Sequence, residues 1–326
     1  MDLPGEMPDV VRRELDGLAA ALDEAIPAKQ LDDNFLLATW NIRNFGAFTA
    51  AWVGEADASP KRDRQSLHAI AEIVRRFDVV AVQEVKRDTS CLRALYELLG
   101  EHWSVILSDV TEGAAGNNER LAFLFDTRRV KLSGLACEIV IPPEHLDHDD
   151  ATRLTRQFAR SPYAVGFSVS GCSLTLVSLH VLWGSAPQER VNELSAIAAW
   201  LSRWSRDKYA WDHDLITVGD FNIKRRDDRF HEAFTSTGLT IPADLLEARR
   251  SVFAGSGGVA AAANGAAYDQ IAWFGDTGTS RPLSLVYRAG GSFDFTSEAL
   301  PSRGLTTAQL SWRISDHLPL WAEFGF

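Results

Sequence analysis

Apolar side chains recur every three or four positions in three stretches of the chain, and this spacing predicts amphipathic helices. The three stretches are 8–27, 60–77 and the residues from 185 to about 201. We expect the first helix to lie on the surface of the protein. A dimer contact or a partner-binding helix is the alternative interpretation of its apolar stripe.

Short apolar runs elsewhere predict buried strands, and polar residues border them. Four such runs lie at 35–40, 78–82, 215–218 and 318–324. Further β-rich runs, broken by Gly, Asp and Pro, are typical of antiparallel strands and lie at 121–125, 135–141, 164–169 and 174–179. A helix followed by a strand occurs twice, at 60–82 and at 185–218, so the pattern predicts two halves of similar layout.

We find no linker that would divide the 326-residue chain. Residues 255–267 are rich in Gly and Ala and carry no charge, which predicts a flexible loop before a strand at 271–274. A layered α/β enzyme of this length fits one domain. We therefore expect an N-terminal helical extension over 1–34 and a single domain over 35–326.

Polar residues of the kind that bind metals or phosphates stand at the edge of an apolar strand in five places. In the last of them, Asp316 and His317 stand side by side before the run 318–324. Five such positions are hard to assign to chance, and they suit metal-assisted phosphate chemistry. The residues are Asn41, Glu84, His180, Asp220 with Asn222, and Asp316 with His317.

Three of these side chains offer hard oxygen ligands. Glu84 and Asp316 supply carboxylates, and Asn41 supplies an amide oxygen, which favours Mg²⁺, Mn²⁺ or Ca²⁺. Zinc is less favoured because no cysteine pair has zinc spacing. We expect His145 and His148 to lie in a solvated acidic loop.

The histidines need an orienting partner to act as proton donors or acceptors, because the contact at one ring nitrogen decides where the proton lies. Taken alone, His180 or His317 is more often a structural residue. Glu119 and Asp269 border apolar strands, which is an expensive place for a carboxylate without a role. Either acid can therefore serve as such a partner.

Composition limits the possible partners. The net charge of −11 argues against nonspecific adhesion to nucleic acid. It leaves a polyanionic substrate possible, because charges beyond about 10 Å are largely screened at 0.1 M salt. No apolar run approaches the roughly 20 residues that span a bilayer. With no secretory pattern at the N-terminus and three widely spaced cysteines, we expect a cytoplasmic protein with reduced thiols.

Seven segments, in order along the chain, resemble the endonuclease/exonuclease/phosphatase superfamily, and most of all its deoxyribonuclease I branch. They are WNIRNFG at 40–46, QEVKRD at 83–88, RSPY at 160–163, LH at 179–180, GDFN at 219–222, YD at 268–269 and SDH at 315–317. Residues 119–125 and 292–295 also resemble that branch. Each segment alone is a weak signal, and their ordered combination is specific.

The resemblance implies a four-layer α/β/β/α sandwich with two mixed β-sheets and a groove along one edge. It implies Mg²⁺ or Mn²⁺ as cofactor, with Ca²⁺ as a structural ion, and DNA as substrate. By the resemblance, the metal ligands are Asn41, Glu84 and Asp316, while Asp220 and Asn222 position water and phosphate or bind a second ion. Acid/base or phosphate-stabilising pairs are formed by His180 with Glu119 and by His317 with Asp269. The residues that contact phosphate groups are Arg160, Arg43 and Lys86.

The chain also departs from that branch. Asn117 stands where such nucleases insert a tyrosine beside the minor groove, and Gln270 follows Asp269 where arginine is usual. Arg43 in place of an acidic residue argues against the abasic-site repair branch. We therefore predict a DNA endonuclease that leaves single-strand nicks.

Two alternatives remain open. The same hydrolytic centre can act on a small phosphoester, a phospholipid head group or RNA, because substrate choice lies in the loops. A catalytically silent binding module is the third hypothesis. The sequence leaves the oligomeric state open.

Overall fold

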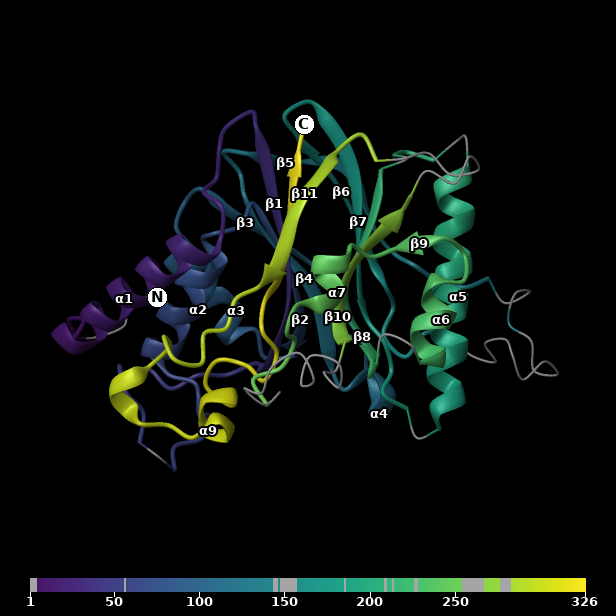
Figure 1. The fold of residues 1–326 in the computed structure, drawn as a ribbon. Helices are drawn as coiled ribbons and strands as arrows, with labels where there is room; N and C mark the ends of the chain where they lie inside the picture. Colours follow the sequence, from purple (N-terminus) through teal and green to yellow (C-terminus); the bar gives the residue numbers. More distant parts are fainter. Residues whose placement is uncertain are drawn as a thin grey trace.

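Two six-stranded sheets pack face to face in the computed structural model of the protein, with helices on both outer sides (Figure 1). The structure describes residues 5–55, 57–142, 146, 157–184, 186–207, 210–212, 214–225, 228–253, 267–275 and 283–326. The predicted four-layer sandwich is confirmed.

The first sheet has the strand order β11-β12-β1-β2-β4-β3. β1 and β2 run parallel, whereas the other neighbours in the sheet are antiparallel. Its strands are β1 (Asn34–Phe45), β2 (Val79–Lys86), β3 (Trp103–Leu107), β4 (Glu119–Asp126), β11 (Val286–Ser292) and β12 (Leu320–Gly325).

The second sheet has the order β5-β6-β7-β8-β10-β9, and here β7 and β8 are the parallel pair. The other neighbours are antiparallel. Its strands are β5 (Val130–Glu138), β6 (Tyr163–Val169), β7 (Cys172–His180), β8 (Leu215–Ile223), β9 (Leu239–Thr240) and β10 (Ala267–Phe274).

Helices cover the two outer faces. α1 (Asp9–Ala25), α2 (Arg64–Val74) and α3 (Ser90–Leu99) lie on the first sheet, and α5 (Pro187–Arg206) and α6 (Arg229–Thr235) lie on the second (Figure 1). The shorter helices are α4 (Gly113–Gly116), α7 (Ala243–Glu247), η2 (Pro301–Arg303) and α9 (Thr307–Ser311).

The core forms three apolar layers, one between the sheets and one under each helical face. The strands divide their side chains between these layers by the twofold alternation of an extended chain. In β1, Phe35 and Leu37 face the second sheet, while Leu36 and Ala38 face α2. Burial on both faces explains why the strands read as continuous apolar runs.

Most predicted elements are confirmed. The units β1-α2-β2 and β7-α5-β8 each place a helix between two parallel strands, which confirms the two halves of similar layout. Residues 255–266 of the predicted loop, together with His145 and His148, lie outside the described residues. Within the described part of the chain, no helix is long and apolar enough to cross a membrane.

The strand ends differ from our prediction. We expected Asn41, Glu84, Asp220 and Asn222 to follow their strands, but all four lie inside them. The pairing of β1 with β2 shifts register between Asn41 and Phe45, which is a bulge, and it resumes at Phe45 and Val85. Both strands therefore extend past Asn41 and Glu84. A bulge lets the strands continue and redirects side chains at that point.

Candidate active site

The layer between the two sheets is apolar along most of its length and becomes polar at one edge. Along β8, the face that carries Ile216 and Val218 continues with Asp220. Along β7, the face that carries Leu174 and Leu176 continues with Ser178 and His180 in the same way. The alternation that builds the core therefore also places Asp220 and His180 at the polar edge.

Strand pairing places several predicted site residues side by side. Asp220 of β8 pairs with His180 of β7 and with Asp269 of β10. In the first sheet, Lys86 of β2 pairs with Glu119 of β4. Neighbouring side chains on paired strands are about 4.5–5.5 Å apart at Cβ, so the register alone brings these groups together.

Gly219 permits the close approach of β7 and β8 at this edge. Its φ is +135°, and a Cβ atom there would lie 2.1 Å from the carbonyl oxygen of Leu179. Any other residue would push apart the two strands that carry His180 and Asp220.

Glu84 adopts a left-handed backbone conformation, with φ +62°. Such a conformation costs about 1–3 kcal/mol for a residue other than glycine and persists where the surroundings hold it. Here the backbone N–H of Asn44 donates to Glu84 Oε2 at 2.7 Å, and Asn41 Nδ2 lies 3.3 Å from Oε1. The carboxylate is therefore turned toward Asn41 at the bulge.

Asp220 lies at the centre of the site. Its Oδ2 accepts a hydrogen bond from Asn41 Nδ2 of the other sheet at 3.0 Å. The Nε2 atoms of His180 and His317 lie 3.7 Å and 3.9 Å from the same oxygen. Burial would raise the pKa of Asp220, but the two imidazoles and the backbone N–H of Asn222 outweigh burial and lower it.

The predicted pairs of histidine and acid are both present. His317 Nδ1 lies 2.7 Å from Asp269 Oδ2. His180 Nδ1 lies 3.0 Å from Glu119 Oε2. Each imidazole thus has a carboxylate at Nδ1 and turns Nε2 toward Asp220, which is the arrangement in which an acid orients a catalytic ring.

His317 and Asp269 differ in how burial acts on them. Burial would lower the pKa of His317, but Asp269, Asp220 and Asp316 raise it to about 10. Burial raises the pKa of Asp269 against the opposing effect of His317. The raised pKa of His317 favours a charged pair, whereas the raised pKa of Asp269 favours a neutral pair. The short contact and the surrounding carboxylates favour the charged form.

Glu119 binds two permanent cations besides His180. Lys86 Nζ lies 2.7 Å from its Oε1, and Arg160 Nε lies 2.7 Å from its Oε2. Burial would raise the pKa of Glu119, but His180, Arg160 and Lys86 lower it to about 2. The predicted phosphate contacts Lys86 and Arg160 are thus placed at the site, where a carboxylate engages them both.

Arg43 and Asp316 form the other side of the site. Arg43 Nη1 lies 3.5 Å from Asp316 Oδ2, and its guanidinium stacks on the Trp312 ring. The hydroxyl of Ser315 donates to the carbonyl oxygen of Asn41 at 2.6 Å and accepts from the N–H groups of Arg43 and His317. Ser315 thereby ties the 315–317 segment to β1.

A divalent cation fits the chemistry of the predicted ligands. Asn41 Oδ1 is buried and has no hydrogen-bond partner, which leaves an oxygen available beside Glu84. Among the described residues, no three His, Cys, Asp or Glu side chains form a metal-binding group. A site built from Glu84, Asp316 and Asn41 is of the kind that Mg²⁺ uses, with one or two carboxylates completed by water and phosphate.

The sequence-based prediction did not include Arg190 of α5, a buried residue that contacts the backbone next to the site. Its guanidinium donates to the carbonyl oxygen of Asn222 at 2.8 Å and to that of Trp183. It therefore joins the end of β8 to the loop that follows His180. An arginine in a predicted amphipathic helix gives no sequence signal for this role, whereas Ser315 could have been found as the direct neighbour of Asp316.

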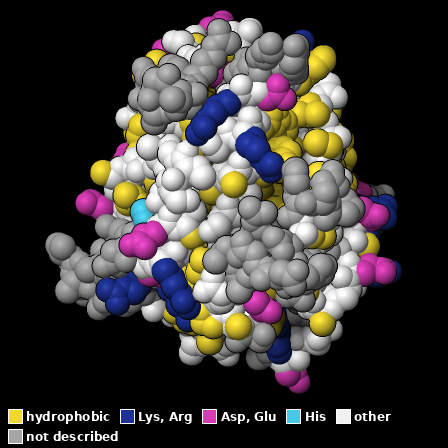
Figure 2. All heavy atoms as spheres, turned by 90° about the vertical axis from the view of Figure 1, so that its right-hand side faces the viewer, with side chains coloured by type: hydrophobic (Ala, Val, Ile, Leu, Met, Phe, Trp, Pro, Cys, Tyr) yellow, Lys and Arg dark blue, Asp and Glu magenta, His cyan; other side chains and the backbone are white. Residues whose placement is uncertain are grey.

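Charge is mixed on the face that carries α5 and α6. Basic and acidic side chains alternate there with uncharged ones, and the described residues show no continuous basic field on this face (Figure 2). Positive charge is instead gathered locally, as in Lys86 and Arg160 around Glu119.

Comparisons with known proteins show a family and several relatives that this chain resembles. A family model described as "Endonuclease/Exonuclease/phosphatase family" matches residues 38–317. A deoxyribonuclease of Thioalkalivibrio sp. (strain K90mix) is 30% identical over 215 residues, which cover 62% of this chain and 50% of that protein. Deoxyribonuclease-1 of Bos taurus is 26% identical over 301 residues, which cover 89% of this chain and 92% of that protein.

The chain spans about half the length of the Thioalkalivibrio protein. Among solved structures, a mannosyl-6-phosphatase of Bacteroides thetaiotaomicron superposes with a TM-score of 0.56 at 17% identity. The match covers 90% of this chain and 100% of that one. At this identity the likeness concerns the fold.

Proposed function

Because the chain belongs to the endonuclease/exonuclease/phosphatase family, we propose that it is a divalent-metal-dependent phosphodiester hydrolase that nicks DNA. One observation carries this proposal. Two imidazoles, each with a carboxylate at Nδ1, turn their Nε2 atoms toward a single oxygen of Asp220. Such a convergence suits a reaction that removes a proton from water and gives one to a leaving oxygen.

The residues of this chain divide the work of hydrolysis. An imidazole whose Nδ1 is held by an acid has Nε2 available to accept a proton from water, or to donate one when protonated. Asp220 and Asn222 would position water and phosphate between the two rings. When bound by Glu84, Asp316 and Asn41, a divalent cation would neutralise the charge that develops on the phosphoryl oxygens.

The choice of DNA rests on the names of the two relatives and on local cations. Both relatives are named as deoxyribonucleases. Arg43, Lys86 and Arg160 gather positive charge at the site of a protein whose net charge is −11. A few cations close to the ester can dominate over distant charges that salt screens.

A smaller phosphoester is the second candidate, and one observation favours it. Lys86 and Arg160 are both engaged by Glu119, which leaves less positive charge for a long polyanion. A small substrate needs fewer backbone contacts than a DNA strand.

Supercoiled plasmid tests the proposal directly. With Mg²⁺ or Mn²⁺ we expect conversion to the nicked circle, which EDTA abolishes and His317→Ala slows by orders of magnitude. Replacement of His102, an exposed histidine outside the site, should leave nicking unchanged and serves as the control. Cleavage of small phosphoesters with no nicking would support the second candidate. Inertness of folded, metal-loaded protein toward both would contradict hydrolysis.

A further inference from the structure

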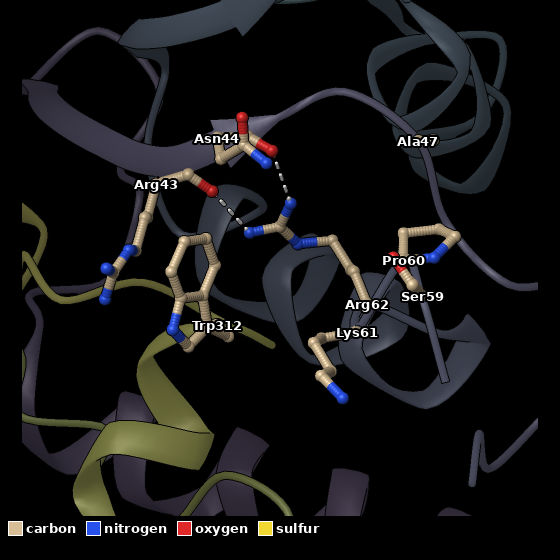
Figure 3. Close-up of a pocket in the computed structure, with 8 residues that line it drawn as sticks. All are labelled: Arg43, Asn44, Ala47, Ser59, Pro60, Lys61, Arg62 and Trp312. Carbon is tan, nitrogen blue, oxygen red and sulfur yellow. Dashed lines mark hydrogen bonds between the residues drawn. The ribbon is translucent and has the colours of Figure 1, made fainter. Parts of the chain in front are cut away.

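A pocket opens beside the active site, next to the side of it formed by Arg43 and Asp316. It has a volume of about 320 Å³, which is at the lower end of the range for small-molecule sites. Figure 3 shows its lining, which comes from the end of β1, the segment 59–62 and the residue after α9. The lining residues are Arg43, Asn44, Ala47, Ser59, Pro60, Lys61, Arg62 and Trp312.

Trp312 gives the pocket an aromatic wall. The side chain is 44% exposed, although it is a large hydrophobic residue. The Arg43 guanidinium stacks on its ring, 3.7 Å from the ring centroid. In Figure 3, Arg43 lies on one side of the ring and Lys61 and Arg62 lie on the other. One side of the ring therefore contacts the Arg43 guanidinium, and the other side borders the pocket.

Arg62 gives the pocket a fixed positive charge. Its guanidinium is buried and donates to four backbone carbonyl oxygens, those of Arg43, Asn44, Arg313 and Ile314. Carbonyl oxygens satisfy its hydrogen bonds without cancelling its charge. With Arg43 and Lys61 in the same lining, the pocket suits a ligand that carries both a flat apolar face and a negative charge.

The pocket is joined to the active site through shared residues. Arg43 also lies 3.5 Å from Asp316, and the backbone N–H of Asn44 donates to Glu84. Both carboxylates are predicted metal ligands. A group in the pocket would therefore lie next to an ester bound at these carboxylates.

We propose that this pocket binds the base of an unpaired nucleotide next to the scissile phosphate, with the base against Trp312 and the adjoining phosphate near Arg43 and Lys61. Bases unstacked from a strand commonly stack on aromatic side chains and arginine planes. Trp312 and the lining residues Ala47 and 59–62 lie outside the seven segments that resemble the family. The inference rests on the proposed function and narrows its substrate to strands with an unpaired base.

The experiment compares two ligands and two proteins. The ligands are tetrathymidylate and a tetramer with the same phosphates in which every nucleotide is an abasic tetrahydrofuran. Dissociation constants are measured by calorimetry with Mg²⁺ in a His317→Ala background, in which cleavage is slowed by orders of magnitude. Trp312→Ala is then added to that background.

We expect Trp312→Ala to weaken tetrathymidylate binding by about 5- to 150-fold, the range that stacking on one aromatic side chain spans. Binding of the abasic tetramer should change less than about twofold, because it has no base to stack. Trp312→Phe should keep most of the affinity for tetrathymidylate. Trp211→Ala, which removes a 66% exposed tryptophan outside this pocket, should change neither constant.

Equal weakening for both ligands would overturn the inference, since the ring would then act only by holding Arg43. No weakening for either, or no binding of tetrathymidylate, would overturn it as well. Cleavage of supercoiled plasmid and of single-stranded DNA by the wild-type protein is scored separately. Cleavage of either DNA without a base-dependent loss removes the pocket assignment alone, whereas a base-dependent loss with cleavage of neither DNA removes the nuclease assignment alone.

Discussion

The two pairs of histidine and acid have the same layout and different electrostatic support. Asp269 is fully buried, and among the ion pairs of the described residues its carboxylate has His317 as its partner. Glu119 is almost as buried but holds Lys86 and Arg160 as well as His180. Burial raises the pKa of Asp269, whereas the cations lower that of Glu119 to about 2.

This difference indicates a division of labour. A carboxylate that serves one imidazole controls the charge and tautomer of that ring. A carboxylate shared among three positive or ionisable groups stays ionised and fixes their positions. We therefore propose that the His317 pair has the larger chemical role and that the Glu119 cluster, defined as Glu119, His180, Lys86 and Arg160, has the larger structural role.

Removal of either imidazole should have the largest effect on activity. We expect His317→Ala and His180→Ala each to lower kcat by about 10² to 10⁴-fold, with His317→Ala the more severe, because general acid/base groups contribute that much. Plasmid nicking rates measure the effect, with unchanged thermal unfolding as evidence of folding. A rate like that of the wild type in either variant would remove that histidine from the mechanism.

Glu119→Gln should have the largest effect on stability. The variant leaves Lys86 and Arg160 facing each other without their carboxylate, and loss of one partner from a buried ion pair costs about 3–5 kcal/mol. Urea denaturation near pH 7 measures the free energy of unfolding. Asp269→Asn serves as the matched comparison and should cost less, since it leaves no permanent cation unpaired. The reverse order would contradict the division of labour.

The same carboxylate predicts a pH dependence. The pKa of Glu119 falls from 4.5 to about 2 on folding, so the folded state binds its proton more weakly than the unfolded state does. Its contribution to stability is therefore complete above pH 4.5 and is lost as the pH falls toward 2. Wild-type protein should lose stability across this window more steeply than Glu119→Gln. Parallel curves for the two proteins would show that Glu119 is not held by its neighbours.

Asp269→Asn should reduce activity by about 10- to 100-fold, the usual effect of removing the partner that orients a functional histidine. The amide keeps the shape of the carboxylate but cannot stabilise an imidazolium. The ratio of kcat for wild type and variant measures this, and it should exceed the ratio for Glu119→Gln at a temperature where both variants are folded. Equal ratios would mean that the two acids have the same task.

Ser315→Ala should have the smallest effect of the set. The hydroxyl joins backbone groups of Asn41, Arg43 and His317, and leaving such buried groups unpaired costs about 1–3 kcal/mol. We expect this loss in urea denaturation together with a modest fall in kcat. The exposed Ser297 offers a control position at which alanine should be neutral. A neutral Ser315→Ala would show that the 315–317 segment is held by other contacts.

Much of the fold follows from local pattern. The apolar pattern of the strands and the apolar stripes of α1, α2 and α5 predicted the elements, because the order of apolar and polar residues shows which faces of an element are buried. The same alternation carried Asp220 and His180 to the polar edge. Both candidate acids, Glu119 and Asp269, were found because a carboxylate beside an apolar strand needs a partner.

The missed features depend on contacts between distant segments. Glu84 takes a left-handed conformation that glutamate rarely adopts, and Asn44 and Asn41 hold it there. The stacking of Trp312 on Arg43 joins residues 269 positions apart, and no local pattern predicts such a contact. Tertiary packing decides these positions, so the bulge at Glu84 and the pocket beside it were absent from the sequence-based prediction.

The most direct test of the site is a crystal structure of the protein with Mn²⁺ and phosphate, in which anomalous scattering locates the metal. We expect the ion at Glu84, Asp316 and Asn41, and the phosphate within hydrogen-bond distance of Nε2 of both His180 and His317. An ion bound away from Glu84 and Asp316, or a phosphate that contacts neither imidazole, would contradict the catalytic roles proposed for these residues.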